Sequence, residues 1–159
     1  MATTVLVTGG TGSIGSLLCD YLSKQGFDVT ILSRRKRENA KYKTFLWNFN
    51  ENFIEAAAFE NCDYIIHLAG AGIADAAWTP KRKKEILDSR VKTTNLLYNF
   101  LASNDHHVKG IISASAVGFY GQVTSQETFK EKDAPGTDFA LRFPSRREEG
   151  VRLKLEYDK

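Results

Sequence analysis

The sequence predicts an α/β fold in which helices cover both faces of a parallel sheet. Short apolar runs alternate with longer segments of helical periodicity, a glycine-rich turn joins the first run to the first helix, and small or polar residues follow the predicted strands. Strands that alternate with helices form parallel sheets through right-handed crossovers, and ligands bind at the carboxyl ends of such strands. We therefore expect a Rossmann-like doubly wound sheet, and 159 residues are enough for one domain with a buried core.

Composition and charge exclude several classes of protein. The hydrophobic fraction of 42% and the charged fraction of 26% are ordinary for a globular domain, and a net charge of +3 does not indicate nucleic acid. No apolar run approaches the roughly 20 residues that span a bilayer, so we expect a cytoplasmic protein without a membrane segment. Cys19 and Cys62 lie among apolar residues, which predicts free buried thiols. No cluster has metal-ligand spacing, so no metal site is predicted.

Residues 5–15, VLVTGGTGSIG, carry the most informative motif. Their apolar start is typical of a buried strand, and a helix is predicted at residues 13–25. A strand, a glycine turn and a helix N-terminus in that order form an anion site, because the first helical amides have no partner within the helix. An ordinary tight turn is the alternative interpretation, but this context favours the pyrophosphate of a dinucleotide. The predicted contacts are Gly9, Thr11, Gly12, Ser13, Ile14 and Gly15. The predicted buried stripe of the helix is Leu17, Leu18, Tyr21 and Leu22.

The end of the second predicted strand, at residues 27–33, indicates which dinucleotide is bound. In Rossmann folds an acidic residue at this position binds the adenosine ribose and favours NAD. This chain has Ser33, Arg34 and Arg35 there instead, and a hydroxyl with guanidinium groups can bind a 2′-phosphate. A solvated basic loop is the alternative. The position relative to the glycine turn favours NADP(H) over NAD(H).

Two further strands are predicted at residues 43–48 and 62–68, with a short helix at residues 51–59 between them. His67 lies within an apolar strand, which is typical of a hydrogen-bonded core histidine rather than a catalytic or metal-binding one. The small residues after this strand let the backbone approach a ligand closely. The predicted contacts to the central part of the dinucleotide are Leu68, Ala69, Gly70 and Ala71.

A long helix is predicted at residues 79–103, with Thr79 as its N-cap and Pro80 at its first position. Its first turns carry the basic run at residues 81–84, which opposes the helix dipole. We interpret this run as a solvated face, and a face for an acidic ligand or partner is the alternative. A fifth strand is predicted at residues 108–114, so Ser113 falls at its end and joins the predicted cofactor contacts.

Three motifs resemble those of the extended short-chain dehydrogenases/reductases, the superfamily of sugar-nucleotide epimerases and dehydratases. They are TGGTGSIG at residues 8–15, HLAGAG at residues 67–72 and SASAVGFYG at residues 113–121. Residues 78–97 are similar to an atypical subgroup, the YfcH-like epimerase-family proteins, whose substrate is generally unassigned. The resemblance runs from residue 4 to about residue 139 and implies an NAD(P)-binding Rossmann domain.

The resemblance also implies where the chemistry lies. In this superfamily a serine after the fifth strand and a Tyr-x-x-x-Lys pair move a proton while the nicotinamide moves hydride. Ser115 matches the serine position, and a plain loop or cap hydroxyl is the evenly weighted alternative. No tyrosine here has a lysine four residues on, as in the subgroup that the chain resembles. Tyr120 is a candidate substitute acid by proximity alone.

We expect a nucleotide-binding domain at residues 1–141 and a divergent tail at residues 142–159, in which residues 151–155 alternate like a strand. The proteins that it resembles carry a smaller substrate domain after the nucleotide domain, and we expect this chain to lack it. Three hypotheses stay open. The chain is the NADP(H)-binding portion of an oxidoreductase or nucleotide-sugar epimerase-like protein with a small-molecule substrate, or a non-catalytic NADP(H)-binding regulatory module. Alternatively, it acts in protein interactions through the helix at residues 79–103, whose counterparts pair in homodimers of related enzymes.

Overall fold

The computed structural model describes residues 2–36, 39–114, 120, 128–130 and 132–134. The elements in chain order are β1 (Thr4–Thr8), α1 (Ser13–Lys24), β2 (Asp28–Ser33), β3 (Lys43–Asn48), β4 (Phe53–Ile54), a 3-10 helix (Ala56–Ala58), β5 (Tyr64–His67), α2 (Pro80–Ser103) and β6 (Gly110–Ser113). The predicted strands at residues 27–33, 43–48, 62–68 and 108–114 are therefore observed, with ends that differ by at most two residues.

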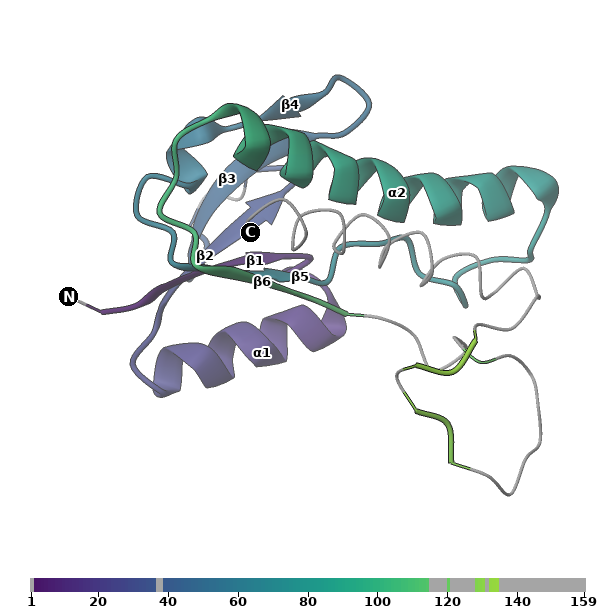
Figure 1. Ribbon diagram of the computed structural model, residues 1–159, viewed down its shortest axis with the longest axis horizontal. Helices are drawn as coiled ribbons and strands as arrows, with labels where there is room; N and C mark the ends of the chain where they lie inside the picture. Colours follow the sequence, from purple (N-terminus) through teal and green to yellow (C-terminus); the bar gives the residue numbers. More distant parts are fainter. Residues whose placement is uncertain (1, 37–38, 115–119, 121–127, 131, 135–159) are drawn as a thin grey trace.

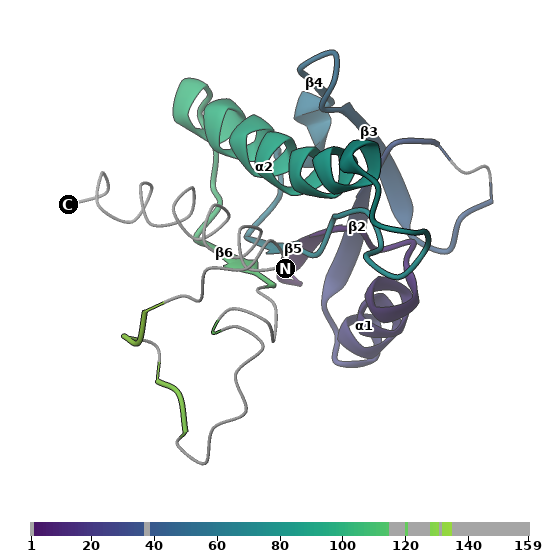
Figure 2. The same cartoon turned by 90° about the vertical axis from the view of Figure 1, so that its right-hand side faces the viewer.

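The strands form one sheet in the order β4-β3-β2-β1-β5-β6, and every pairing is parallel except that of β3 with β4. α1 covers one face of the sheet and α2 covers the opposite face (Figures 1 and 2). From β1 the sheet extends through β2 and β3 on one side and through β5 and β6 on the other. The predicted doubly wound fold is confirmed, and β1 lies at the switch point where such sheets bind ligands.

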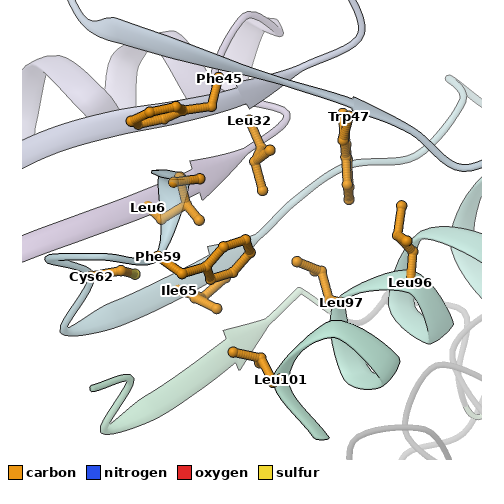
Figure 3. Close-up of a cluster of buried hydrophobic side chains, with 11 residues drawn as sticks. Leu6, Leu32, Phe45, Trp47, Phe59, Cys62, Ile65, Leu96, Leu97 and Leu101 are labelled. Carbon is orange, nitrogen blue, oxygen red and sulfur yellow. The ribbon is translucent and has the colours of Figure 1, made fainter. Parts of the chain in front are cut away.

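Alternate residues of the central strands contribute to two separate cores. The core under α2, shown in Figure 3, consists of Leu6, Leu32, Phe45, Trp47, Ala58, Phe59, Cys62, Ile65, Leu96, Leu97 and Leu101. The core under α1 consists of Val5, Val7, Cys19, Val29 and Ile31. Because both faces are covered, the strands need continuous apolar runs. Both cysteines are free and buried, as predicted, and burial raises the pKa of each thiol to about 11.

The ends of the helices follow from local sequence. Gly26 comes directly after the C-cap of α1 and has φ +87°, a left-handed conformation that glycine adopts without strain. At the start of α2, the Thr79 side chain accepts a hydrogen bond from the backbone N–H of Arg82 at 3.2 Å, and Pro80 occupies the first helical position. The predicted start of the long helix is confirmed.

The predicted buried stripe on α1 is right for two of its four residues. Leu18 and Leu22 are partly buried, and Leu22 packs against the core under α1. Leu17 and Tyr21 are 73% and 61% exposed, whereas the fully buried residues of this helix are Gly15 and Cys19. A Cβ on Gly15 would collide with the carbonyl oxygen of Gly9, so the helix can approach the glycine turn this closely only because position 15 has no side chain.

The short helix predicted at residues 51–59 is wrong. Asn52 has φ +51°, and the chain reverses there so that β4 pairs antiparallel to β3. The Glu55 carboxylate then accepts a hydrogen bond from the backbone N–H of Leu46 at 2.8 Å. Within this segment the three alanines form a single 3-10 turn. Pairing with β3 outweighs the helix propensity of the alanines.

The predicted tail at residues 142–159, its strand at residues 151–155 and the boundary at residue 141 lie outside the described residues. Across the part of the chain that the structure describes, no helix is both long enough and apolar enough to cross a bilayer. The same residues contain no group of three or more His, Cys, Asp or Glu side chains placed to hold a metal ion.

Candidate functional site

The carboxyl ends of β1, β5 and β6 lie side by side at one edge of the sheet. Thr8, His67 and Ser113 are paired in register across these strands, so their side chains face the same side of the sheet. The glycine turn follows Thr8, and residues 68–72, here called the 68–72 loop, follow His67. Ser33 ends the neighbouring strand β2. The glycine turn, the 68–72 loop, Ser33 and Ser113, which were predicted separately as cofactor contacts, therefore lie at one edge of the sheet.

The glycine turn and the 68–72 loop are in direct contact. The N–H of Leu68 donates to the carbonyl oxygen of Thr8 at 3.1 Å, and a Cβ on Gly9 would lie 3.0 Å from the backbone of Leu68 and of Ala69. Gly9 also has φ +73°, so a side chain is excluded both by space and by conformation. The N–H of Gly12 donates to the carbonyl oxygen of Gly9 at 3.0 Å and closes the turn.

The N-terminus of α1 is left open by its own sequence. Gly12 is the N-cap and makes no side-chain capping bond, and the first turn contains no acidic residue. Thr11, Gly12, Ser13 and Ile14 are exposed at this end, and Ile14 is 74% exposed. The first helical amides and the positive end of the helix dipole are therefore accessible, which is the arrangement that binds a phosphate.

Below the glycine turn, His67 connects β1, β5 and α2. Its Nδ1 lies 2.6 Å from the Oγ1 of Thr8, and its Nε2 lies 3.4 and 3.3 Å from the Oγ1 atoms of Thr93 and Thr94. The N–H of Ala69 donates to the same Thr8 oxygen at 3.1 Å. His67 is 1% exposed and hydrogen-bonded, so the prediction of a core histidine is confirmed. Its bonds hold the strand ends in place.

Ser113, a predicted cofactor contact, and the two candidate catalytic residues Ser115 and Tyr120 have different surroundings. The Ser113 Oγ is buried and has no hydrogen-bond partner among the described residues, a cost that a ligand atom would remove. Ser115 lies outside the described residues. The Tyr120 hydroxyl donates to the carbonyl oxygen of Lys130 at 2.8 Å, and its ring stacks on Phe129 with centroids 4.6 Å apart. These contacts of Tyr120 do not join it to the strand ends.

Residues 33–36, here called the basic loop, follow the carboxyl end of β2, the strand next to β1. Arg34 and Arg35 are exposed, and the Ser33 Oγ accepts a long hydrogen bond of 3.4 Å from the backbone N–H of Arg35. Neighbouring strands lie about 4.8 Å apart, so the Ser33 end of β2 is one strand spacing from the end of β1.

Asp20 of α1 fastens the chain that leads from the basic loop into β3. Its carboxylate accepts hydrogen bonds from the Lys41 ammonium at 2.7 Å and from the Tyr42 hydroxyl at 2.6 Å. These two bonds lower the pKa of Asp20, that from Lys41 most. This hydrogen-bonded group is at the surface, since about half of the Asp20 side chain is exposed.

Three residues of α2 hold the 68–72 loop and were not predicted from the sequence. The Ser89 Oγ accepts a hydrogen bond from the Ala71 N–H at 2.9 Å, and Arg90 Nη1 donates to the Ala71 carbonyl at 3.1 Å. Arg82 donates to the Gly72 carbonyl at 2.6 Å, and its side chain is 15% exposed. The interpretation of the basic run as solvated is therefore wrong for Arg82. The i, i+7 and i+8 spacing of these residues on one side of a helix is the signal that would have found them.

Residues 5–143 match the NAD dependent epimerase/dehydratase family. This chain belongs to that family. An epimerase family protein of Staphylococcus aureus is 35% identical over 115 residues, which is 72% of this chain. The epimerase family protein YfhF of Bacillus subtilis is 37% identical over 131 residues, which is 82% of this chain. The chain spans 38% and 43% of the length of these two relatives.

Solved structures give the same family and fold. The human epimerase family protein SDR39U1 (isoform 2), solved with NADPH, has a TM-score of 0.78 at 28% identity over 94% of this chain and 49% of its own. A nucleoside-diphosphate sugar epimerase from Corynebacterium glutamicum has a TM-score of 0.77 at 28% identity over 100% of this chain and 32% of its own. UDP-N-acetylglucosamine 4-epimerase from Bacillus cereus, 21% identical with a TM-score of 0.74 over 99% of this chain and 54% of its own, shares the fold.

Proposed function

We propose that this chain is the NADP(H)-binding portion of an oxidoreductase or nucleotide-sugar epimerase-like protein. The observation that carries the proposal is the open N-terminus of α1, whose glycine turn packs directly on the 68–72 loop. Two linked phosphates would accept hydrogen bonds from the first amides of α1 at the positive end of its dipole. The human relative solved with NADPH supports this class of cofactor.

Each part of the edge has its own role in this proposal. The glycine turn receives the pyrophosphate, because Gly9 and Gly12 place no side chain between the phosphates and the helix amides. The 68–72 loop contacts the central part of the dinucleotide, and the buried Ser113 hydroxyl donates a hydrogen bond to the ligand beside it. The nicotinamide would supply or accept a hydride.

The basic loop supports a preference for NADP(H). The four residues after Ser33 are Arg34, Arg35, Lys36 and Arg37, so the carboxylate that favours NAD is absent from this stretch. Ser33 offers a hydroxyl, and Arg34 offers a planar guanidinium that binds a phosphate through two parallel hydrogen bonds. We propose that these two groups bind the 2′-phosphate, with Arg35 beside them.

Titration with NADPH and NADH tests the cofactor and the preference separately. We expect NADPH to bind more tightly, and Arg34→Ala to weaken NADPH by about 10-fold or more while NADH changes little, since charge-assisted hydrogen bonds are lost. Lys24→Ala removes the same charge at the far end of α1 and is the matched control. Equal affinity for both cofactors overturns the preference, and no binding of either overturns the cofactor proposal.

A non-catalytic NADP(H)-binding module is the second candidate function. The observation that favours it is the Tyr120 hydroxyl, the candidate substitute acid, which donates to the Lys130 carbonyl. The sequence also has no Tyr-x-x-x-Lys pair. Oxidation of NADPH with a panel of carbonyl compounds and nucleotide sugars separates the two candidates. Turnover that Ser115→Ala abolishes supports the enzyme, and no turnover with any of these substrates supports the module.

A further inference from the structure

The 68–72 loop is attached to α2 through both polar groups of one residue, Ala71. The Ala71 N–H donates to the Ser89 Oγ at 2.9 Å, and the Ser89 hydroxyl donates in turn to the Ile86 carbonyl at 2.8 Å. Since the Ser89 proton is used within the helix, its oxygen is directed as an acceptor toward the loop. The Ala71 carbonyl accepts from Arg90 at 3.1 Å. Both peptide groups of Ala71 are thus oriented by one turn of α2.

Arg90 is a half-buried cation that lies under the loop. Its Nη1 donates to the carbonyl oxygens of Ala71 and Ile86, both at 3.1 Å. A Cβ on Gly70 would lie 3.0 Å from the Arg90 Cζ, so the guanidinium packs directly against the Cα of Gly70. Burial lowers the pKa of Arg90, which means that the cation is held there against a desolvation cost. The contact between the Arg90 guanidinium and Gly70 therefore sets the position of the loop.

We propose that Arg90 is a positioning residue that fixes the backbone of the 68–72 loop in the shape that receives the central part of the dinucleotide. The proposal rests on the proposed cofactor function. Arg90 acts through its hydrogen bond to Ala71 and its contact with Gly70, and it need not touch the ligand. A lysine in its place can donate to one carbonyl but cannot supply the flat surface under Gly70.

The location of Arg90 predicts which ligands lose affinity when it is replaced. Its hydrogen bonds described above reach the 68–72 loop and the backbone of α2, whereas the basic loop lies on the other side of β1. NADPH uses both regions, but adenosine 2′,5′-bisphosphate lacks the central and nicotinamide portions and relies on the basic loop and the glycine turn. Loss of Arg90 should therefore weaken NADPH far more than it weakens this fragment.

Calorimetric titration of both ligands against Arg90→Met and Arg90→Lys tests the proposal. We expect Arg90→Met to weaken NADPH by about 10-fold or more and the fragment by about twofold or less, with Arg90→Lys between it and the wild type. Lys92→Met removes a charge from the exposed face of the same helix and should change neither affinity. Equal loss of affinity for the two ligands, or no loss for either, overturns the positioning role.

Hydrogen exchange of the Ala71 amide separates failure of this proposal from failure of the cofactor function. If the wild type binds neither NADPH nor the fragment, the cofactor proposal falls, and exchange still decides whether Arg90 holds the loop. We expect the Ala71 amide to exchange faster in Arg90→Met and in Ser89→Ala than in Lys92→Met, with amides of β1 unchanged. An unchanged exchange rate of the Ala71 amide in these variants would show that Arg90 and Ser89 do not hold the 68–72 loop. Arg90→Lys keeps the test available if Arg90→Met does not fold.

Discussion

The proposed ligand site, at the carboxyl ends of the strands, has one end at β1 and β5 and another at β2, and the two ends are built differently. At β1 and β5, buried hydrogen bonds from Thr8 and His67 and a glycine that admits no side chain fix the glycine turn against the 68–72 loop. At β2, Arg34 and Arg35 are exposed, and the hydrogen bond within the basic loop is 3.4 Å long. Among the described residues, the hydrogen bonds of the first end are formed without a ligand, whereas the second end presents exposed guanidinium groups and one long hydrogen bond.

This difference suggests that affinity and cofactor choice depend on different ends of the site. A preorganised backbone loses little further entropy when a ligand binds, so under the proposed function the β1 and β5 end would determine the affinity for any dinucleotide. An exposed guanidinium contributes only where a phosphate is present, so under the same proposal the β2 end would determine the choice between cofactors. Substitutions at the first end should change stability and the affinity for both cofactors. Substitutions at the second end should change the affinity for one cofactor and leave stability nearly unchanged.

Gly15→Ala should have the largest effect. The new Cβ would collide with the carbonyl oxygen of Gly9 and with the Cα of Gly10, so α1 must move away from the glycine turn. We expect a loss of about 1–3 kcal/mol in the free energy of unfolding, as for other overpacked sites, and an equal loss of affinity for NADPH and NADH. Urea unfolding and titration of both cofactors measure the two effects.

Gly26→Ala is the control for Gly15→Ala. A Cβ on Gly26 meets nothing within 4 Å, but φ is +87°. We expect a strain cost of about 1–2 kcal/mol with no change in the affinity for either cofactor. If Gly15→Ala also spared the affinity for both cofactors, the preorganised shape of the glycine turn would not determine binding.

Thr8→Val should have an intermediate effect at the same end. The substitution keeps the shape of the side chain but removes the partner of the Ala69 N–H and of the His67 Nδ1. Leaving a buried polar group unpaired costs about 1–3 kcal/mol of unfolding free energy. The affinity for NADPH and for NADH should fall together, because Ala69 belongs to the 68–72 loop. Thermal unfolding and the two titrations measure this result.

Thr30→Val on β2 is the matched control for Thr8→Val. The Thr30 hydroxyl is buried and has no hydrogen-bond partner among the described residues. Replacing it with a methyl group should be neutral or stabilising, because no partner loses a bond. A Thr8→Val protein as stable as Thr30→Val would show that the His67 network does not hold the strand ends.

The parts of the fold that depend on local pattern could be predicted from the sequence, and the parts that depend on distant contacts could not. The start of α2 and the turn at Gly9 follow from capping residues and glycine positions that are adjacent in the chain. Ser89 and Arg90 meet Ala71 across 18 and 19 residues, and the packing of α2 on the sheet decides that contact. The burial of Gly15 likewise depends on how closely α1 approaches the glycine turn, which periodicity does not encode.

Asp20→Asn should have the smallest effect and should act at the β2 end alone. Asparagine keeps the shape of the side chain but loses the charge that binds the Lys41 ammonium, so the chain after the basic loop is held less firmly. We expect the ratio of NADPH to NADH affinity to fall by about two- to threefold, as for other surface ion pairs, with NADH affinity unchanged. An equal loss of affinity for NADPH and NADH in the same titrations would show that Asp20 does not act through the basic loop at the end of β2.

The pH dependence of the Asp20 contact gives a second test with a definite sign. Hydrogen bonds from Lys41 and Tyr42 lower the pKa of Asp20 below its ordinary value of about 3.9. A carboxyl whose pKa is lowered by folding contributes stability above its unfolded pKa and loses that contribution as the pH falls through the folded value. The wild type should therefore be slightly more stable than Asp20→Asn in urea at neutral pH, and the difference should shrink below about pH 4. A difference in unfolding free energy of the same size at both pH values would mean that the charge of Asp20 does not hold the segment between the basic loop and β3.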